Sequence, residues 1–374
     1  MDTYKWRATA AFSLEGVVAN ELRRLGFDDA RGAEGCAVFF GAMDDALRAN
    51  LHLRCADRVM LEFGSFQATT FDELFEGVRA LPWEDLLPSN AALPVTGKCA
   101  RSQLMSVRDV QAITKKAIVE RMKKAYRLNW LPEDGPSYAV DAHIHANAAL
   151  LCVDSSGAGL SRRGYRTWNG EAPLRETIAA AMTLVSPWRP GQPLLDPMCG
   201  TGTIAIEAAM IAMNRAPGIG RDFAMEGWAQ ANAKVMAELR EQARAAEREP
   251  SSPIYGGDTD ESALELARRH VQQAGVGDAV RLSLCDARDI RAEGARGAVI
   301  ANPPYGERLG GKDEAREAAR ALRACRDAHP GWSLTALTSD VGFERAFGRR
   351  ADKRRRLFNG RLECELLQFF GAKG

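Results

Sequence analysis

The sequence lacks the long apolar segments that would place it across a membrane. None of its 374 residues lies in a run approaching the roughly 18 apolar residues that a spanning helix needs. The first residues, MDTYKWRATAAFSLEGVVANELRR, do not combine a basic segment with a continuous apolar core, so they do not resemble a secretion signal. The sequence therefore predicts a cytoplasmic protein.

Paired cysteines and an excess of charge are also missing. The eight cysteines are widely spaced, and the absence of any CxxC pair argues against a zinc site and against a disulfide framework. We therefore predict no metal, and cysteines that are reduced and mostly in the core. Fifty Lys and Arg residues against 49 Asp and Glu residues leave a formal charge of +1, so a polyanionic partner must be met by local basic patches.

What the sequence does contain is ordinary globular composition, with 46% hydrophobic and 26% charged residues, and enough length for two or three domains. The second half alternates helical periodicity with short apolar strands, a pattern that predicts a parallel α/β sheet. Before about residue 155 the elements are short and mixed, which predicts α+β modules. The intervening segment SSGAGLSRRGYRTWNGEAP has no apolar periodicity and is predicted to be an interdomain linker.

A glycine-rich loop joins a strand to a helix in LLDPMCGTGTIAIE, residues 194–207. Gly200 and Gly202 would let the backbone approach a ligand and leave helix N–H groups pointing at it. The loop opens with Asp196 and lacks the GxGxxG spacing of dinucleotide-binding folds, so a ligand with a cationic amino group, salt-linked to Asp196, fits better than a pyrophosphate. The alternative is a tightly packed turn that binds nothing.

Two further acids follow later strands. Asp258 ends the strand IYGGD, where an acidic side chain can accept hydrogen bonds from a ribose diol, and Asp286 closes VRLSLCD. Asp260 is better interpreted as the N-cap of the next helix. Because ligands of open α/β sheets lie beyond the carboxyl ends of the strands, we expect the three strand-end acids Asp196, Asp258 and Asp286 to converge.

The segment ANPPYGERLG, residues 301–310, follows another strand and combines three features. The two prolines restrict the backbone, so the side chain of Asn302 and the carbonyl of Pro303 become preset acceptors. Tyr305 adds a flat stacking face. Two acceptors and an aromatic ring suit an exocyclic amine on a nucleobase that has left its stack, whereas a plain proline-rich turn does not explain why all three coincide.

DPMCGTGT and NPPY together resemble class I S-adenosylmethionine-dependent methyltransferases that act on an exocyclic amino nitrogen. Further motifs in order resemble the THUMP-domain guanosine methyltransferases of bacterial ribosomal RNA, and the chain is similar to the N-terminal half of their bifunctional members. These motifs are GLSRRGYR, APLRETIAAAM, DPMCGTGTIAIEAAMIAMNRAPG, GWAQANAKVMAELREQARA, YGGDTDESALELAR, NPPYGERLG and LFNGRLEC. The resemblance is strong over about residues 155–374 and looser before them.

The resemblance implies a fold and a division into domains. The expected architecture is a Rossmann-like class I methyltransferase domain with a mostly parallel seven-stranded sheet, preceded by α+β ferredoxin-like and THUMP modules. The expected boundaries are a ferredoxin-like segment 1–60, an RNA-binding THUMP domain 61–155, a linker 156–172 and a catalytic domain 173–374. The bifunctional members carry a further methyltransferase domain, so a chain ending at Gly374 is expected to have the first activity only.

One spacing departs from a simple nucleotide-binding unit. Asp196 and Asp258 are 62 positions apart, where such a unit would have about 20. The intervening stretch 215–253 resembles an insertion of the family, so the alignment still holds.

The resemblance also implies the activity, which is methylation of the 2-amino group of a guanosine in RNA, with 23S ribosomal RNA as the expected substrate. The residues expected to hold the S-adenosylmethionine are Asp196, Met198, Gly200, Gly202, Asp258 at its ribose and Asp286 at its adenine. The target base is expected on Asn302, Pro303 and Tyr305. Cys199 lies in the cofactor loop and not in the base-binding loop, so a packing role is preferred to a nucleophilic one.

Basic residues are the candidate RNA contacts. Lys115–Arg127 holds six basic residues against Glu120, and a second run, Arg349–Arg356, holds six against Asp352. A solvated helix face is the ordinary interpretation, but within a THUMP module the first run suits phosphate contacts. The expected contacts are Lys115, Lys116, Lys123, Lys124, Arg162 and Arg163. The linker arginines, Arg166 included, have a second interpretation, which is that they tether the linker to the catalytic domain.

Three alternatives stay open from the sequence. The NPPY motif also serves the 6-amino group of adenine, although no DNA target-recognition domain is evident. A noncatalytic RNA-binding protein with this fold is possible in principle, but the intact acids and Asn302 argue against it. Finally, THUMP enzymes that methylate guanosine in transfer RNA share the catalytic loop.

Overall fold

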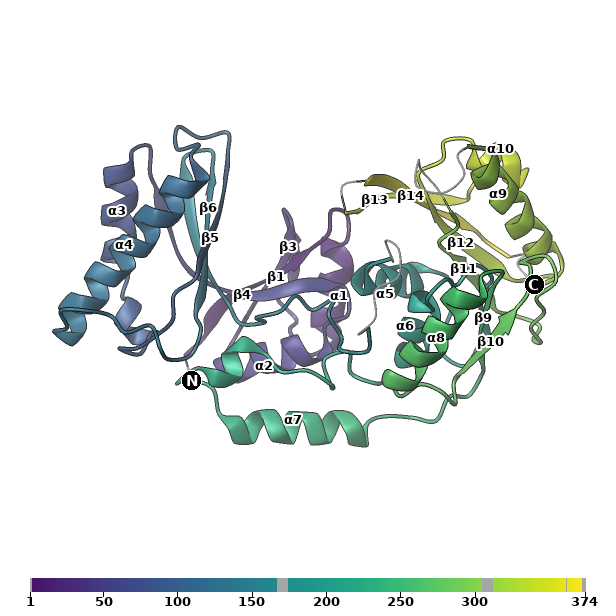
Figure 1. Cartoon of the computed structure of the whole chain (residues 1–374), viewed down its shortest axis with the longest axis horizontal. Coiled ribbons are helices and arrows are strands. Elements are labelled where there is room, and N and C mark those ends of the chain that lie inside the picture. The colour runs from purple at the N-terminus through teal and green to yellow at the C-terminus, as the bar shows by residue number, and fades with distance from the viewer. Residues whose placement is uncertain (1, 167–173, 305–311, 361, 372–374) are drawn as a thin grey trace.

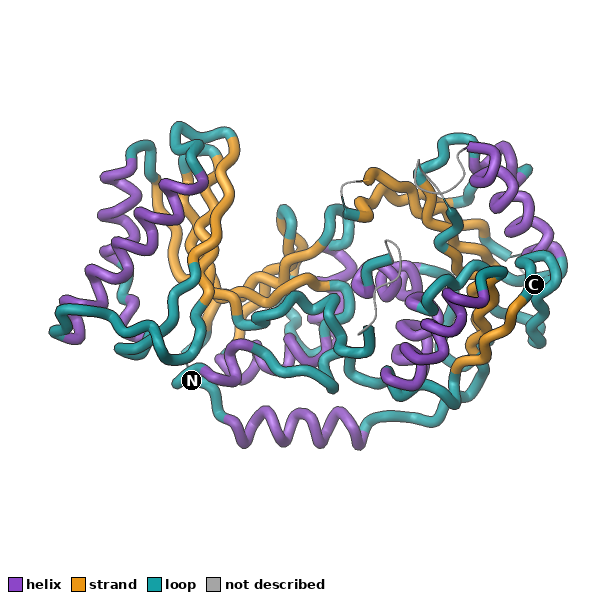
Figure 2. The backbone as a smooth tube through the Cα atoms, in the orientation of Figure 1, coloured by secondary structure: helices purple, strands orange, loops and turns teal. Residues whose placement is uncertain are grey.

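The structure is a computed structural model that describes residues 2–166, 174–304, 312–360 and 362–371. Two seven-stranded sheets, one from each half of the chain, form an elongated molecule with the THUMP-like end and the catalytic end far apart (Figure 1). The backbone trace shows helices against both sheets (Figure 2). None of the helices in the described ranges is both long and apolar enough to cross a bilayer.

The first sheet has the strand order β2-β3-β1-β4-β7-β6-β5. Its elements are β1 Tyr4–Ala10, α1 Glu15–Arg24, β2 Arg31–Ala33, β3 Cys36–Gly41, α2 Met43–His52, β4 Ala56–Gln67, α3 Phe71–Ala80, β5 Val95–Ala100, α4 Val107–Tyr126, β6 Ala139–His145 and β7 Ala148–Asp154. The mixed α+β character expected for this half is therefore present. Helix α4 carries most of the basic run Lys115–Arg127 and ends at Tyr126, where Arg127 takes a left-handed conformation with φ 56°.

Strand β4 belongs to two modules at once. Its first half pairs with β1, from Ala56 to Leu61, and its second half pairs with β7, from Met60 to Gln67. The boundary expected between residues 60 and 61 thus falls inside one strand, and the two N-terminal modules share a continuous sheet. Such sharing couples them mechanically, since a hinge there would break ladder hydrogen bonds.

The second sheet has the order β10-β9-β8-β11-β12-β14-β13, parallel from β10 to β12 and antiparallel at β14 and β13. This confirms a mostly parallel seven-stranded sheet. Its elements are α5 Glu176–Val185, β8 Leu194–Asp196, α6 Thr203–Ala212, α7 Ala233–Ala245, β9 Ile254–Asp258, α8 Glu261–Gln273, β10 Val280–Leu284, β11 Ala298–Ala301, α9 Lys312–Asp327, β12 Ser333–Thr338, α10 Phe343–Phe347, β13 Lys353–Asn359 and β14 Leu362–Phe369. Strand order reverses between β8 and β11, and in open α/β sheets ligands bind beyond the strand ends at such a switch point.

Most of the basic run at residues 349–356 belongs to the edge strand β13, where Lys353, Arg354 and Arg356 are exposed, as a solvated face requires. Each residue of that strand pairs with β14, from Lys353 opposite Gln368 to Asn359 opposite Leu362. Carboxylates of neighbouring elements balance its charge, as in the Arg354–Glu344 and Arg356–Glu363 ion pairs.

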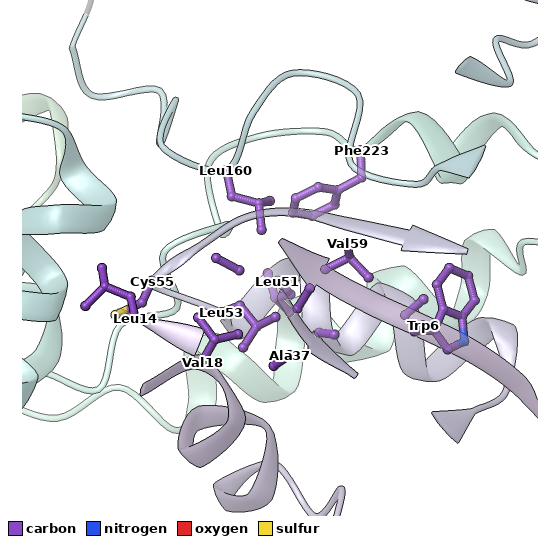
Figure 3. Packing of buried hydrophobic residues seen from close by; sticks show 14 of the residues in the cluster. Trp6, Leu14, Val18, Ala37, Leu51, Leu53, Cys55, Val59, Leu160 and Phe223 are labelled. Atoms are coloured by element: carbon purple, nitrogen blue, oxygen red, sulfur yellow. The ribbon is translucent and has the colours of Figure 1, made fainter. Parts of the chain in front are cut away.

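The described part of the expected interdomain linker, residues 156–166, forms no helix or strand and mixes buried with exposed residues. Ser155 and Ser156 are fully buried and hydrogen-bond to Val59 on β4. Leu160 is buried beside Phe223 and near Val59 (Figure 3). Residues 167–172 of the expected linker, and Pro173, lie outside the described residues. Residues 156–166 are therefore anchored at several points to the N-terminal half, and the expected linker boundaries stay a prediction.

The insertion of the catalytic half holds the two halves together. Helix α7 packs along α2 (Figure 1). Before it, Trp228 stacks on Tyr138 of the first half, with ring centroids 4.8 Å apart and planes 14° apart. The Tyr138 hydroxyl also accepts a hydrogen bond from the N–H of Ala229 at 3.1 Å. The insertion thus fixes the THUMP-like end relative to the catalytic sheet.

Candidate active site

The glycine loop after β8 has the geometry of a ligand cradle. Gly200 and Gly202 both adopt positive φ, at 50° and 82°, which side-chain-bearing residues rarely do. A Cβ on Gly202 would lie 3.2 Å from the Cβ of Ala267, so glycine also permits the close approach of α6 and α8. A Cβ on Gly200 would meet no described heavy atom within 4 Å. The loop therefore packs closely against α8 at Gly202, whereas at Gly200 its backbone is open to a ligand.

Asp196 ends β8 as a buried carboxylate without a partner. Its exposed fraction is 1%, and neither carboxylate oxygen has a hydrogen-bond partner among the described residues. Burial, reinforced by the nearby Asp258 carboxylate, raises the pKa of Asp196 well above its ordinary value. A buried, unpaired acid is costly, and a bound ammonium group would supply its counter-charge.

Asp258 ends β9 and is bound to the same loop. One carboxylate oxygen accepts the N–H of Gly200 at 2.7 Å, and the other accepts the N–H of Asp260 at 3.0 Å. Each oxygen retains a lone pair for a further donor. Asp260 itself caps α8 by accepting the N–H groups of Ser262 and Ala263, which confirms its interpretation as an N-cap.

The other residues expected at the cofactor are less available. Asp286 follows β10, and its carboxylate accepts the N–H of Arg288 and pairs with the Arg288 guanidinium, both at 2.8 Å. Met198 is partly buried against a hydrophobic cluster that includes Leu195 and Val299. Cys199 is 7% exposed, and burial raises the pKa of its thiol well above the ordinary value. A nucleophile must form a thiolate, so the structure favours the packing role for Cys199.

Asn302 follows β11 directly and presents an acceptor without a donor. Its Oδ1 is buried and has no hydrogen-bond partner among the described residues, which is uncommon for a buried amide. Pro303, buried, and Pro304, partly buried, follow it and restrict the backbone. Tyr305, the expected stacking residue, lies outside the described residues. Asn302 Oδ1 is thus available to a donor that the described residues do not supply.

The strand register brings these groups to one edge of the sheet. Asp196 pairs with Gly256, so Asp258 lies two residues farther along β9. Leu195 pairs with Val299, so Asn302 likewise lies two residues beyond the level of Asp196. Neighbouring strands are about 4.8 Å apart. Asp258 and Asn302 therefore flank the Asp196 loop on opposite sides of β8.

The four candidate lysines of α4 differ in their contacts. Lys115 forms an ion pair with Glu133 at 2.8 Å, and the Lys116 ammonium lies 5.6 Å from the ring centroid of Phe75. Lys123 and Lys124 lie in the last turn, and the described residues give them no ion-pair partner. Among the lysines of α4, Lys123 and Lys124 are therefore the two that no described residue engages.

The expectation that Arg163 contacts RNA is wrong. Arg163 is 5% exposed, pairs with the fully buried Glu207 at 3.3 Å, and donates to the carbonyl oxygens of Leu160 and Arg54. A guanidinium enclosed in this way cannot reach a phosphate. Arg162, its neighbour, is exposed.

The tether interpretation does describe Arg163 and Arg166. Arg166 pairs with Glu176 and donates to the Thr203 hydroxyl at the start of α6. Sequence reasoning missed the partner Glu207, whose signal was a single acid in the otherwise apolar helix TIAIEAAMIA. It also missed Tyr165, whose hydroxyl donates to Glu207 at 3.2 Å and for which the sequence offered no signal.

Comparison with known proteins identifies the parts of the chain. Residues 5–60 match the RlmL ferredoxin-like domain, residues 68–154 the THUMP domain, and residues 163–368 the RMKL-like methyltransferase domain. The chain is 40% identical over 373 residues to the putative RNA methyltransferase YpsC of Bacillus subtilis, covering 99% of this chain and 97% of that protein.

Two further relatives bear on the site. The chain is 35% identical to the ribosomal RNA large subunit methyltransferase K/L of Syntrophotalea carbinolica, covering 98% of this chain and 53% of that protein. The crystal structure of SMU.472, a putative methyltransferase complexed with SAH, superposes with a TM-score of 0.94 at 39% identity and covers 100% of both chains. With a matched catalytic domain spanning more than half of its length, the chain belongs to the RMKL-like methyltransferase family.

Proposed function

We propose that this protein transfers a methyl group from S-adenosylmethionine to the 2-amino group of a guanosine in RNA, with 23S ribosomal RNA as the substrate. The observation that carries the proposal is the buried, unpartnered Oδ1 of Asn302 at the switch point of the sheet. An exocyclic amine has two N–H donors, and Asn302 Oδ1 together with the Pro303 carbonyl would accept both. A base without an amine in that position would leave the buried acceptor unsatisfied.

The residues around β8 fit the cofactor. Asp196 offers a buried carboxylate to its ammonium group, Gly200 opens toward free space, and Asp258 retains lone pairs for its ribose hydroxyls. We further propose that Gly202 and Met198 line its binding site and that Asp286 faces its adenine. When bound, S-adenosylmethionine supplies an electrophilic methyl group on a sulfonium.

The protein's contribution to the reaction is positioning and electrostatics. The lone pair of an aryl amine is normally delocalised into the ring. If Asn302 Oδ1 and the Pro303 carbonyl accept hydrogen bonds from its two N–H groups, that lone pair would be localised on nitrogen and directed toward the methyl group in line, and the nitrogen would release one proton to solvent as the N–C bond forms and the sulfonium C–S bond breaks. Tyr305 is proposed to stack on the base and to hold it at this angle. No covalent bond to the enzyme is required.

The names of the relatives support the substrate class. YpsC is named a putative RNA methyltransferase, and the K/L enzyme is named for large-subunit ribosomal RNA. A bound SAH in SMU.472 supports the cofactor. We propose that the THUMP domain selects the RNA, with Lys123, Lys124 and Arg162 as phosphate contacts. Lys115 and Lys116 are weaker candidates because an acid and an aromatic ring already engage them.

The proposal is tested by a direct product analysis. Purified protein is incubated with isotope-labelled S-adenosylmethionine and, separately, with 23S RNA, 16S RNA and transfer RNA lacking their modifications. Each RNA is then digested, and its nucleosides are identified by mass spectrometry. Labelled N2-methylguanosine in 23S RNA is expected. Labelled N6-methyladenosine would overturn the guanosine assignment, and N2-methylguanosine confined to transfer RNA would overturn the ribosomal substrate.

A further inference from the structure

A groove outside the candidate active site lies between the N-terminal domain and the catalytic sheet. It is a groove of about 330 Å³ between α1, the end of α5 and the edge strand β13. We call it the interdomain groove. It is lined by Gly16, Val17, Asn20, Glu21, Arg24, Leu184, Val185, Lys353 and Arg355. None of them belongs to the candidate active site.

The interdomain groove carries positive charge from both domains. Arg24 on α1 and Lys353 on β13 are exposed, and no described residue forms an ion pair or hydrogen bond with their side chains. Arg355 donates to the carbonyl of Ser13 across the domain boundary. Glu21, the one acid in the lining, is 9% exposed, and its two oxygens accept the N–H groups of Arg54 and Cys55. Two free cations therefore face the groove without a counter-charge.

An aromatic and cationic cluster lies beside the same strand. Phe12, in the turn before α1, is 50% exposed although it is a large apolar side chain. Its ring meets Phe358 edge-on with centroids 5.8 Å apart, and the Arg356 guanidinium lies 5.3 Å from its centroid. The ends of β13 and β14 reach this N-terminal segment (Figure 1). Phe12 thus remains half exposed beside a cation.

Strand register places this cluster at the active-site edge. Strand β12 ends at Thr338, which pairs with Glu365, and Glu365 pairs with Arg356. Phe358 therefore lies two residues beyond the end of β12. This is the edge from which Asn302 emerges after β11, three strands away. At about 4.8 Å per strand, the separation across the sheet is roughly 14 Å, a distance that a few nucleotides of extended RNA can span.

We propose that the interdomain groove and Phe12 bind a single-stranded RNA segment adjoining the target nucleotide. Arg24 and Lys353 contact phosphates of this segment, and Phe12 stacks on an unpaired base a few nucleotides from the one that enters the active site. Alternation of cations with an exposed ring is the chemistry of sequence-tolerant single-strand binding. Because one cation comes from each domain, the surface exists only when the domains are docked. This inference rests on the proposed action on RNA and adds how the strand reaches the site.

The first test removes the two free cations in the full-length protein. The double variant Arg24→Ala, Lys353→Ala is expected to bind a single-stranded oligoribonucleotide more weakly, and the slope of log affinity against log salt is expected to flatten by about 1.4, at about 0.7 per contact. The matched control is Arg244→Ala, Arg248→Ala, which removes the same charge from exposed arginines in and just after α7, outside the lining of the interdomain groove. Equal slopes for the wild-type protein and the groove variant would overturn the inference.

The second test addresses the ring. Phe12→Leu keeps an apolar contact with Phe358 but removes the stacking face, and is expected to weaken oligoribonucleotide binding on the order of tenfold without changing the salt slope. Phe12→Trp is expected to retain binding. Inorganic triphosphate is the competing probe: if it displaces the oligoribonucleotide equally well from wild-type protein and Phe12→Leu, the surface binds phosphate alone and the stacking role is wrong. Product analysis of wild-type protein reports separately on the proposed function.

Discussion

The carboxylate of Asp258 accepts the backbone N–H of Gly200 at 2.7 Å, and this bond joins the end of β9 to the loop that follows β8. The same side chain that would hold the ribose also fixes the loop that would surround the amino-acid part of the cofactor. Ligand contact and loop geometry are therefore coupled through one carboxylate, and a substitution there should affect both.

We predict that Asp258→Ala weakens S-adenosylmethionine binding by about 1 to 3 kcal/mol, the scale of a lost charge-assisted hydrogen bond. Isothermal calorimetry measures the change. The control is Asp260→Ala, which removes the cap of α8 and should lower stability by about 1 kcal/mol while leaving cofactor affinity close to wild type. Unchanged affinity in Asp258→Ala would remove this residue from the site.

Asp196 should oppose stability and serve binding at the same time. Because burial raises its pKa in the folded protein, the folded state keeps a proton that the unfolded chain loses above about 3.8. Stability from this group therefore falls as pH rises from that value toward the raised folded pKa. Asp196→Asn should abolish this part of the slope, leave the ligand-free protein at least as stable at pH 8, and lose cofactor binding. Thermal melts across pH, with and without cofactor, measure both effects.

Asn302 should separate catalysis from cofactor binding. Asn302→Ala removes the acceptor proposed for the target amine, so turnover should fall on the order of a hundredfold or more, while cofactor affinity changes little. Single-turnover methylation of RNA and calorimetry with S-adenosylmethionine measure the two quantities. A variant that methylates at the normal rate would contradict the proposed role of Asn302.

The lysines of α4 should differ among themselves. Lys123→Ala, Lys124→Ala removes two unpaired charges and should weaken RNA binding and flatten its salt dependence, whereas Lys115→Ala, Lys116→Ala removes charges already engaged by Glu133 and Phe75. Filter binding at several salt concentrations compares the two double variants. An equal loss in both would show that total charge, and not free ammonium groups, sets affinity.

Much of the catalytic half could be predicted because its signals are local. Strands such as Ile254–Asp258 and the glycine loop at Gly200 are encoded in short stretches, and strand ends of a parallel sheet meet at one edge. Strand β13 was not predictable in this way. Its arginines look solvated in the sequence, and only pairing with β14 brings Arg356 to Glu363.

The missed residues depend on partners far along the chain. The role of Arg163 follows from Glu207, 44 positions later, and from the carbonyl of Arg54 in another domain. An arginine in a Gly-rich and Ser-rich segment has the same local sequence whether it faces solvent or a buried acid. The packing of Leu160 and Phe223 in the core buries Arg163 and so decides between these two environments. The residues that bring about this packing are distant in the sequence, so no short stretch of sequence signals it.

The buried pair of Arg163 and Glu207 yields the last prediction. Glu207 is fully buried on α6, the helix that begins at the glycine loop, and Arg163 connects it to the carbonyl of Arg54 in the N-terminal domain. Removing one partner leaves an uncompensated buried charge, so Arg163→Met should lower the free energy of unfolding by about 3 to 5 kcal/mol. The double variant Arg163→Met, Glu207→Met removes both charges and should recover most of that loss. Chemical denaturation of the wild-type protein, Arg163→Met, Glu207→Met and the double variant measures the cycle. If Arg163 acted through RNA alone, as the sequence suggested, Arg163→Met would unfold like wild type and lose only RNA affinity.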